Sequence, residues 1–250
     1  MAALDKAIYD YHNTDKTVTT ILKEYNISKS TFYRHLDYKE ELREKKRSRK
    51  YTFNFDNFKK DSPNKYYWLG FLGADGSVVN NTLSIELKTI DKEHLEKFNS
   101  FFENTAPITD RINNLNVPCS KTQINSYELI KYLQQYNIYQ NKSKTYTIPI
   151  EKIPNEYLMD FIRGLIDGDG YVRINNHHQI SLGFCSGNKK CIEQFKKIID
   201  LDNKISQDKY TFSIQVTGNK KAKAILDKIY KNSNDNTRLN RKYSIYKTLN

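Results

Sequence analysis

The chain has 250 residues, of which 38% are hydrophobic and 28% charged, a balance typical of a globular protein rather than a disordered one. Lys and Arg number 41 against 29 Asp and Glu, and the resulting net charge of +12 favours polyanionic partners such as nucleic acid or an anionic membrane surface. No apolar run approaches the ~18 residues of a membrane-spanning helix, and the three cysteines lack the spacing of a disulfide framework or a structural zinc site.

Residues 1–44 are expected to form a small helical domain of their own. Residues 17–25 form a short amphipathic helix, and Ser28 is a good N-cap for a second helix at residues 29–36. Two short helices joined by a tight turn resemble the helix-turn-helix domains of resolvases and transposases, in which the second helix enters the major groove of DNA. A plain helical hairpin is the alternative. The DNA-contacting residues implied by this resemblance are Ser30, Thr31, Tyr33 and Arg34.

Residues 45–62 are interpreted as a basic linker. Lys45, Lys46 and Arg47 begin its run of positive charge. Most charge runs are simply solvated, which is the alternative here. Between two units that bind DNA, however, lysines and arginines are well placed to contact phosphates. We therefore include these three residues among the candidate DNA contacts.

The next part of the chain contains two segments that repeat one another. Residues 67–79 read YWLGFLGADGSVV, and residues 161–174 read FIRGLIDGDGYVRI. Each is an apolar helix with small residues on one face, and each ends in an acid followed by glycine. The two acids, Asp75 and Asp169, are 94 residues apart. A duplicated helix that carries a duplicated acid at its tip predicts a pseudo-two-fold site made from one chain.

The repeat extends beyond these helices, and it divides the chain into halves at residues 63–150 and 151–250. Each half is predicted to contain a helix, a hairpin, a helix, a hairpin and a helix. The strands predicted in the first half are residues 77–79, 83–87, 107–112 and 117–124. Those predicted in the second half are residues 171–174, 179–185, 204–206 and 210–216.

The repeated segments resemble the LAGLIDADG motif of the homing endonucleases. The closer copy is GLIDGDG at residues 164–170, and the resemblance covers roughly residues 63–249. The first copy departs from the motif at Trp68, Leu69, Phe71, Leu72 and Gly73. The resemblance implies an α+β fold of two pseudo-symmetric αββαββα halves that form a DNA-binding saddle, with the motif helices packed side by side. The alternative is a pair of core helices that merely end in Asp-Gly.

The resemblance also implies a chemistry for the helix tips. Two like carboxylates held close together repel each other unless a cation lies between them. Mg²⁺, or another divalent cation such as Mn²⁺, suits carboxylate and backbone oxygens. The implied metal ligands are the carboxylates of Asp75 and Asp169 and the backbone of Ala74 and Gly168. The implied reaction is hydrolysis of one phosphodiester in each strand of DNA, which gives a double-strand break across the minor groove with short 3′ overhangs.

Further residues resemble accessory positions of the family, with weaker matches. Asp91 and Asn188 follow the second predicted strand of each half and resemble positions that place water or metal. Lys142 and Lys242 follow the last predicted helix of each half and resemble basic catalytic positions. For either lysine, an exposed charge or a simple phosphate contact is the alternative.

The two halves are not equal. The sixth motif position is Asp167 in the second copy and Gly73 in the first, so this position is not expected to be an essential metal ligand, and Asp167 is interpreted as structural or supporting. The first hairpin of the second half is also three residues longer. We therefore expect a symmetric cutting centre flanked by unequal DNA-reading surfaces.

Base recognition is expected on the first hairpin of each half, since a twisted antiparallel ribbon fits the major groove. The sequence does not decide which face of the hairpin reads bases. The first-half candidates are Ser77, Thr82, Ser84, Glu86 and Lys88. The second-half candidates are Arg173, Asn175, His177, His178, Gln179 and Ser181. The two histidines lie on a predicted turn without a third ligand, so DNA contact or solvent exposure is favoured over metal binding.

Taken together, the sequence predicts a monomeric endonuclease that makes a double-strand break in a long asymmetric DNA target and so serves the homing of a mobile element. Two alternatives use the same fold: a transcription regulator that binds DNA without cutting it, and a maturase that binds intron RNA. Because the N-terminus lacks the pattern of a signal peptide, a cytosolic, nucleoid-associated protein is expected. The abundance of Lys, Asn, Ile and Tyr is typical of an AT-rich genome, such as that of a phage, its bacterial host or an organelle.

Overall fold

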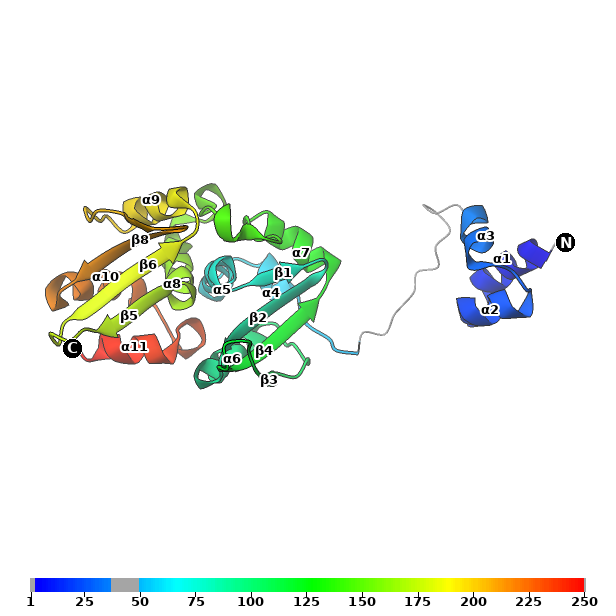
Figure 1. Cartoon of the computed structure of the whole chain (residues 1–250), viewed down its shortest axis with the longest axis horizontal. Helices are drawn as coiled ribbons and strands as arrows, with labels where there is room; N and C mark the ends of the chain where they lie inside the picture. The colour runs from blue at the N-terminus through cyan, green and yellow to red at the C-terminus, as the bar shows by residue number, and fades with distance from the viewer. Residues whose placement is uncertain (1–2, 37–49, 250) are drawn as a thin grey trace. The chain divides into compact units, whose positions relative to one another are not determined.

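The computed structural model describes residues 3–36 and 50–249, and the chain forms two compact units, Met1–Lys50 and Tyr51–Asn250 (Figure 1). The linker residues Lys45, Lys46 and Arg47 lie outside the described residues. Among the described helices, none combines the length and the apolar character needed to cross a membrane.

The described part of the N-terminal unit contains one helix more than the sequence analysis predicts. Its helices are α1 (Ala3–Asn13), α2 (Val18–Glu24) and α3 (Lys29–His35). The helices α2 and α3 are the predicted pair, and the Ser28 side chain caps α3 by accepting a hydrogen bond of 3.1 Å from the backbone N–H of Thr31. The unpredicted α1 supplies Ala7 and Tyr11, which pack with Phe32 in a small closed core. Two short helices alone would leave this apolar surface in water.

The larger unit has the predicted order αββαββα in each half. The first half comprises α4 (Asp56–Lys59), α5 (Pro63–Ala74), β1 (Ser77–Val79), β2 (Thr82–Lys88), α6 (Lys92–Phe101), β3 (Thr109–Ile112), β4 (Pro118–Asn125) and α7 (Tyr127–Gln134). The second half comprises α8 (Leu158–Gly168), β5 (Gly170–Ile174), β6 (Ile180–Ser186), α9 (Lys189–Ile198), β7 (Ser206–Asp208), β8 (Thr211–Thr217), α10 (Asn219–Tyr230) and α11 (Asn240–Lys247). The strand predicted at residues 204–206 is wrong by two residues, and α11 was not predicted.

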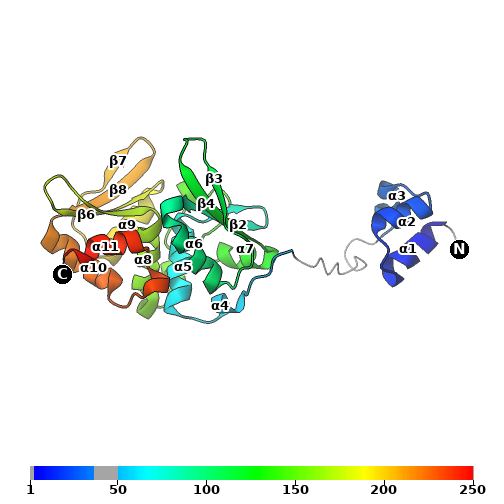
Figure 2. The ribbon, with the colours of Figure 1, turned by 90° about the horizontal axis from the view of Figure 1, so that it is seen from below.

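Each half contains one four-stranded antiparallel sheet, with the strand orders β1-β2-β4-β3 and β5-β6-β8-β7. Side chains alternate between the two faces of a strand, so Leu83 and Ile85 of β2 point into the core while Ser84 and Glu86 lie on the open face. Figure 2 shows the labelled strands β3 and β7 on the same side of the unit, with the short helix α4 on the opposite side. Because the apolar side chains of the strands point into the core, the open faces carry mostly polar side chains.

The motif helices α5 and α8 lie side by side between the two sheets (Figures 1 and 2). Gly70 and Gly164 make this approach possible. A Cβ atom added to Gly70 would overlap the carbonyl oxygen of Phe161, and one added to Gly164 would overlap the carbonyl oxygen of Tyr67. The predicted close packing of the two motif helices is confirmed, and glycine is the residue that permits it.

Candidate active site

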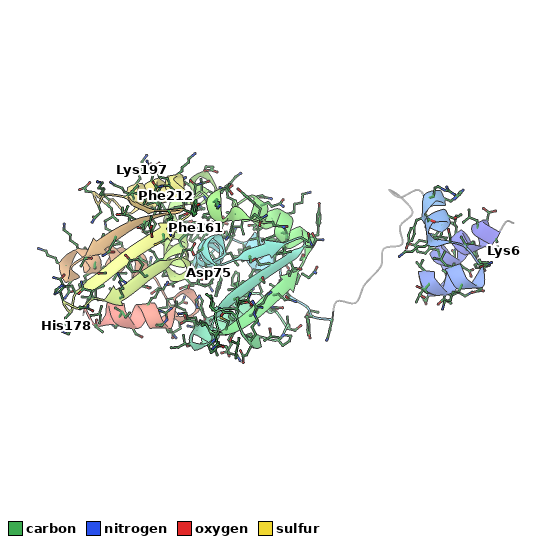
Figure 3. All side chains as sticks on the ribbon, viewed as in Figure 1. Lys6, Asp75, Phe161, His178, Lys197 and Phe212 are labelled. Carbon is green, nitrogen blue, oxygen red and sulfur yellow. The ribbon has the colours of Figure 1, made fainter. Side chains whose placement is uncertain are left out.

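The two acids predicted to form the site come together at the ends of the motif helices. Asp75 is the C-cap residue of α5 and Asp169 is that of α8. The helices end at the same place, because a Cβ added to Gly168 would overlap the Cβ of Ala74 and lie 3.5 Å from Oδ2 of Asp75. Figure 3 shows Asp75 near the middle of the unit, between the two sheets. The Asp75 side chain is half-buried, whereas that of Asp169 is exposed.

The surroundings of the two carboxyl groups disfavour their ionised forms. Desolvation, together with the nearby charge of Asp169, raises the pKa of Asp75 to about 6, although Lys242 and Lys142 act in the opposite direction. Although Asp169 is exposed, the protein packed around its carboxyl group removes part of its hydration, and this desolvation raises its pKa while Lys142 and Lys242 act in the opposite direction. A divalent cation between the carboxylates would stabilise both charges.

The donor set at the helix tips fits an oxygen-ligated cation. The described residues contain no cluster of three or more His, Cys, Asp or Glu side chains that could hold a metal ion. A cation bound by Asp75 and Asp169 would therefore take its other ligands from backbone carbonyls, water and phosphate oxygens. Mg²⁺ characteristically binds proteins in this way, through one or two carboxylates and substrate phosphates.

Replacing Asp75 by Asn should stabilise the metal-free protein at pH 7 by about 1–3 kcal/mol, because the raised pKa means that ionisation of Asp75 opposes folding. Between about pH 4 and 6 the folded wild-type protein binds this proton more tightly than the unfolded chain does, so wild-type stability falls as the pH rises through that window. The stability of the Asn variant should not show this fall, because Asn does not ionise. Urea denaturation in EDTA at pH 4 and pH 7 measures the difference. An advantage that is equal at both pH values would contradict this account.

The two candidate lysines have different surroundings, although both are buried and burial lowers the pKa of each. The Nζ of Lys142 donates one hydrogen bond, of 2.9 Å, to the carbonyl oxygen of Ala74. The Nζ of Lys242 donates to four carbonyl oxygens at 2.6–3.2 Å, those of Ile166, Asp167, Gly168 and Gly170. An ammonium group has three N–H bonds. All N–H donors of Lys242 are therefore used by carbonyl oxygens at the end of α8, whereas Lys142 has N–H donors left for a substrate.

Lys142 also faces open space. It lines a pocket of about 240 Å³ together with Asp169, Tyr146 and Ser186. The Tyr146 hydroxyl is buried and has no hydrogen-bond partner among the described residues. Tyr146 and Ser186 are site residues that the sequence analysis missed, because neither lies in a motif and only the fold brings them to α8.

We expect the variants Lys142→Met and Lys242→Met to differ in stability. Loss of Lys242 removes the donor shared by four carbonyl oxygens, and leaving buried acceptors without donors should cost about 3 kcal/mol or more. Loss of Lys142 removes one hydrogen bond and should cost about 1 kcal/mol. Thermal denaturation of the two matched variants measures this, and an equal loss would show that the two lysines are equivalent after all.

The two accessory positions are also unequal. Asp91 is buried and accepts hydrogen bonds from Arg241, at 3.0 Å from Nε and 2.8 Å from Nη2, and its charge contributes to the raised pKa of Asp75. Asn188 instead caps α9, where its side chain accepts a 3.0 Å hydrogen bond from the N–H of Lys190. Asp91 is thus an ion-paired carboxylate beside the acid pair, whereas Asn188 supports the start of α9.

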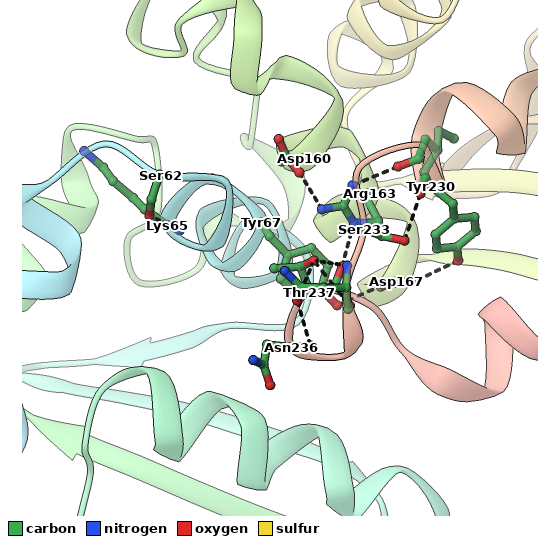
Figure 4. Close-up of polar contacts among 12 residues, drawn as sticks. Ser62, Lys65, Tyr67, Asp160, Arg163, Asp167, Tyr230, Ser233, Asn236 and Thr237 are labelled. Carbon is green, nitrogen blue, oxygen red and sulfur yellow. Dashed lines mark hydrogen bonds and ion pairs between the residues drawn. The ribbon is translucent and has the colours of Figure 1, made fainter.

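Asp167 makes only internal contacts, which agrees with its structural interpretation (Figure 4). It accepts hydrogen bonds from the Tyr67 hydroxyl at 2.9 Å, the Leu239 N–H at 2.8 Å and the Tyr230 hydroxyl at 3.3 Å. It therefore joins α5 of the first half to the segment that precedes α11, and so to Lys242. In the first half, Gly73 leaves the space that the Tyr146 hydroxyl occupies.

Strand register decides which candidate base-reading residues share a face. The first-half candidates all lie on the open face of their sheet, as the pairs Ser77–Ser84 and Thr82–Asn125 show. In the second half, Arg173 pairs with Ser181, but Ser181 is buried and its hydroxyl lies 3.1 Å from that of Thr217, so of this pair only Arg173 is available to DNA. The other candidates, Asn175, His177, His178 and Gln179, belong to the hairpin turn, and Figure 3 shows His178 far from Asp75.

The sequence analysis missed the open-face residues of the remaining strands. They include Thr109, Arg111, Lys121, Gln123, Asn125, Ser206, Asp208, Thr211, Ser213, Gln215 and Thr217, together with Tyr171 of β5. The residues KTQIN at 121–125 contain only one apolar side chain, Ile124, so polar and apolar residues do not alternate there, and only the pairing of β4 with β2 and β3 shows which of these side chains share the open face.

In the N-terminal unit, the candidates lie along α3. Ser30 and Arg34 are exposed, whereas Thr31 and Tyr33 are half-buried. The hydroxyl groups of Ser30 and Thr31 both lie within hydrogen-bond distance of the Ser28 hydroxyl, at 3.0 and 2.8 Å. Arg34 is therefore the candidate most available to a partner.

Comparison with known proteins identifies the fold. The family model described as a LAGLIDADG-like domain matches residues 156–230. A search of curated proteins finds no match.

Several solved structures of DNA complexes are similar to this chain, among them the following three. The LAGLIDADG homing endonuclease I-LtrWI bound to target DNA has a TM-score of 0.54 at 12% identity, covering 75% of this chain and 89% of that one. The LAGLIDADG homing endonuclease I-GzeII in complex with its DNA target has a TM-score of 0.52 at 14% identity, covering 76% and 89%. The meganuclease I-SmaMI bound to uncleaveable DNA has a TM-score of 0.52 at 12% identity, covering 74% and 87%. Residues 156–230 therefore form a LAGLIDADG-like domain, and the larger unit has the fold of the single-chain LAGLIDADG homing endonucleases.

Proposed function

We propose that this chain is a site-specific, metal-dependent endonuclease that makes a double-strand break in a long asymmetric DNA target and serves the homing of a mobile element. The observation that carries the proposal is the meeting of Asp75 and Asp169 at the ends of two touching helices, where desolvation raises the pKa of each carboxyl group. Two acids at one point, supplied by two related halves, suit the cutting of two strands.

The proposed cation is Mg²⁺ or Mn²⁺, held by the carboxylates of Asp75 and Asp169 and by the carbonyl oxygens of Ala74 and Gly168. Each of these carbonyls already accepts a hydrogen bond from a lysine, and a carbonyl oxygen has a second lone pair for a metal. When bound, the cation would supply Lewis-acid stabilisation of the reacting phosphate.

The protein itself contributes charge and position. The spare N–H bonds of Lys142 point to a role in binding a phosphate oxygen, and Lys242 fixes the end of α8 that carries Asp169. Asp91 is assigned an accessory role beside Asp75, and Asn188 one that supports the second half. The open faces of the two sheets are proposed to read bases.

The proposed domains are residues 63–150 and 151–250 for the two halves, preceded by a helix-turn-helix in residues 1–44 and a basic linker. In this arrangement α3 lengthens the recognised site, and Lys45, Lys46 and Arg47 contact phosphates along the way. The chain acts on double-stranded DNA as a monomer, because both acids come from one chain.

A cleavage assay on DNA flanking the gene's own insertion site tests the proposal. Purified full-length chain should convert a plasmid that carries this DNA to the linear form in Mg²⁺ but not in EDTA. Specific binding without cleavage, in both Mg²⁺ and Mn²⁺, would favour a transcription regulator. Tighter binding to the intron RNA than to the DNA, with faster splicing, would favour a maturase.

A further inference from the structure

One arginine on the open face of the second sheet differs from the other arginines of its unit. Five arginines lie within residues 51–249, and four of them are paired with a carboxylate. These pairs are Arg111–Glu86, Arg163–Asp160, Arg238–Asp235 and Arg241–Asp91. The fifth, Arg173 of β5, is exposed and forms no ion pair or hydrogen bond with the residues that the structure describes. Its five N–H donors remain available.

Arg173 is nevertheless held in place. Its guanidinium carbon lies 4.9 Å from the ring centroid of Tyr171, its neighbour two residues earlier on the same face of β5. This distance is within the range of a cation–π interaction. The Tyr171 hydroxyl donates a 2.6 Å hydrogen bond to Oε1 of Gln215, whose Nε2 donates at 2.8 Å to the Thr217 hydroxyl. The aromatic ring under the guanidinium is thus anchored across the sheet to β8.

Gly183 of β6 is what allows the Tyr171 ring to lie over the sheet. The two residues are register partners, and a Cβ atom added to Gly183 would overlap the ring. Any larger residue at position 183 would displace the ring and remove the platform from beneath Arg173.

We infer that Arg173 is a specificity-determining residue that reads a guanine in the major groove, and that Tyr171, Gln215 and Gly183 position it. A planar guanidinium matches the O6 and N7 acceptors of guanine with two parallel hydrogen bonds. Stacking on Tyr171 fixes its plane before DNA binds, so less side-chain entropy is lost on binding. This inference rests on the proposed function and specifies one base of the target sequence.

The position of this base follows from the strand. Arg173 is four residues beyond Asp169, and a strand advances ~3.3 Å per residue, so its Cα lies roughly 13 Å along the chain from that of Asp169. One base step of DNA covers ~3.4 Å. The guanine should therefore lie about four base pairs from the scissile phosphate on the side of the second half.

Selection from a randomised duplex library, by binding of the full-length chain in the absence of Mg²⁺, tests the inference. The wild-type chain should prefer guanine over adenine at one such position by roughly 5- to 150-fold. Arg173→Ala should abolish this preference and leave the rest of the consensus unchanged. Arg111→Ala, which removes an open-face arginine of the first sheet, is the matched control and should leave this position unaffected.

Two further variants test the positioning residues. Tyr171→Phe keeps the ring and should retain most of the guanine preference, whereas Gly183→Val should lose most of it while thermal denaturation shows a folded protein. If Gly183→Val unfolds, Tyr171→Ala tests the same platform and should also lose the preference.

The possible outcomes separate this inference from the proposed function. If Arg173→Ala binds all DNA sequences more weakly by the same factor, Arg173 contacts a phosphate rather than a base, and the inference is overturned. The inference is also overturned if Arg173→Ala keeps the guanine preference, or if the wild-type chain cleaves specifically but its consensus lacks that guanine. A wild-type chain that neither binds nor cuts DNA would overturn the proposed function and the inference together.

Discussion

Replacement of Asp75 or Asp169 by Asn is expected to lower the rate of double-strand cleavage at least ~1,000-fold while DNA binding is retained. Each substitution removes a charge that would hold the cation, and metal stabilisation of a reacting phosphate contributes several kcal/mol, which corresponds to a loss of this size. Plasmid linearisation gives the rate, and a gel shift with the same DNA gives the affinity.

The control for these two variants is Asp202→Asn, which replaces an exposed acid of the same unit outside the acid pair. It should cut at the wild-type rate. If Asp75→Asn or Asp169→Asn still cuts both strands normally, the assignment of the catalytic acids is wrong.

The largest loss of stability is expected for Gly164→Val. A side chain at this position would overlap the carbonyl oxygen of Tyr67 and crowd the backbone nitrogen of Phe71, so α5 and α8 would have to separate. Because such a clash is with backbone, the free energy of unfolding should fall by about 3 kcal/mol or more. Urea denaturation measures the change.

Gly218→Ala provides the comparison for this variant. Gly218 has a φ of +112° but nothing lies within 4 Å of an added Cβ, so its substitution has a conformational cost without a clash, on the order of 1 kcal/mol. If Gly164→Val were no less stable than Gly218→Ala, the helices would not approach as closely as described.

Much of the fold could be predicted because the chain repeats its own pattern. The change from helical to alternating periodicity after Asp75 recurs after Asp169, which predicted both sheets and the order of elements. The strand β7 was placed two residues early because its side chains are all exposed and its position is set by pairing with β8. The helix α1 has apolar residues at helical spacing, at Leu4, Ala7, Ile8 and Tyr11, and this spacing is the pattern that could have predicted it.

The environment of the site residues could not be predicted from the sequence. Lys142 and Lys242 follow equivalent helices, so the repeat made them look equivalent. Only the packing of α11, whose Tyr243 and Tyr246 contact Tyr230, brings Lys242 to four carbonyl oxygens at the end of α8. Likewise, the pairing of Asp91 with Arg241 joins residues 150 positions apart.

One chain is expected to cut both strands of a long target through a shared acid pair flanked by unequal reading surfaces. Sequencing both ends of every molecule that the full-length chain cuts from a randomised library in Mg²⁺ tests it most directly. The expected result is one asymmetric consensus, with the two cuts offset to leave short 3′ overhangs. A palindromic consensus would contradict the unequal halves, and the absence of any paired ends would contradict double-strand cleavage itself.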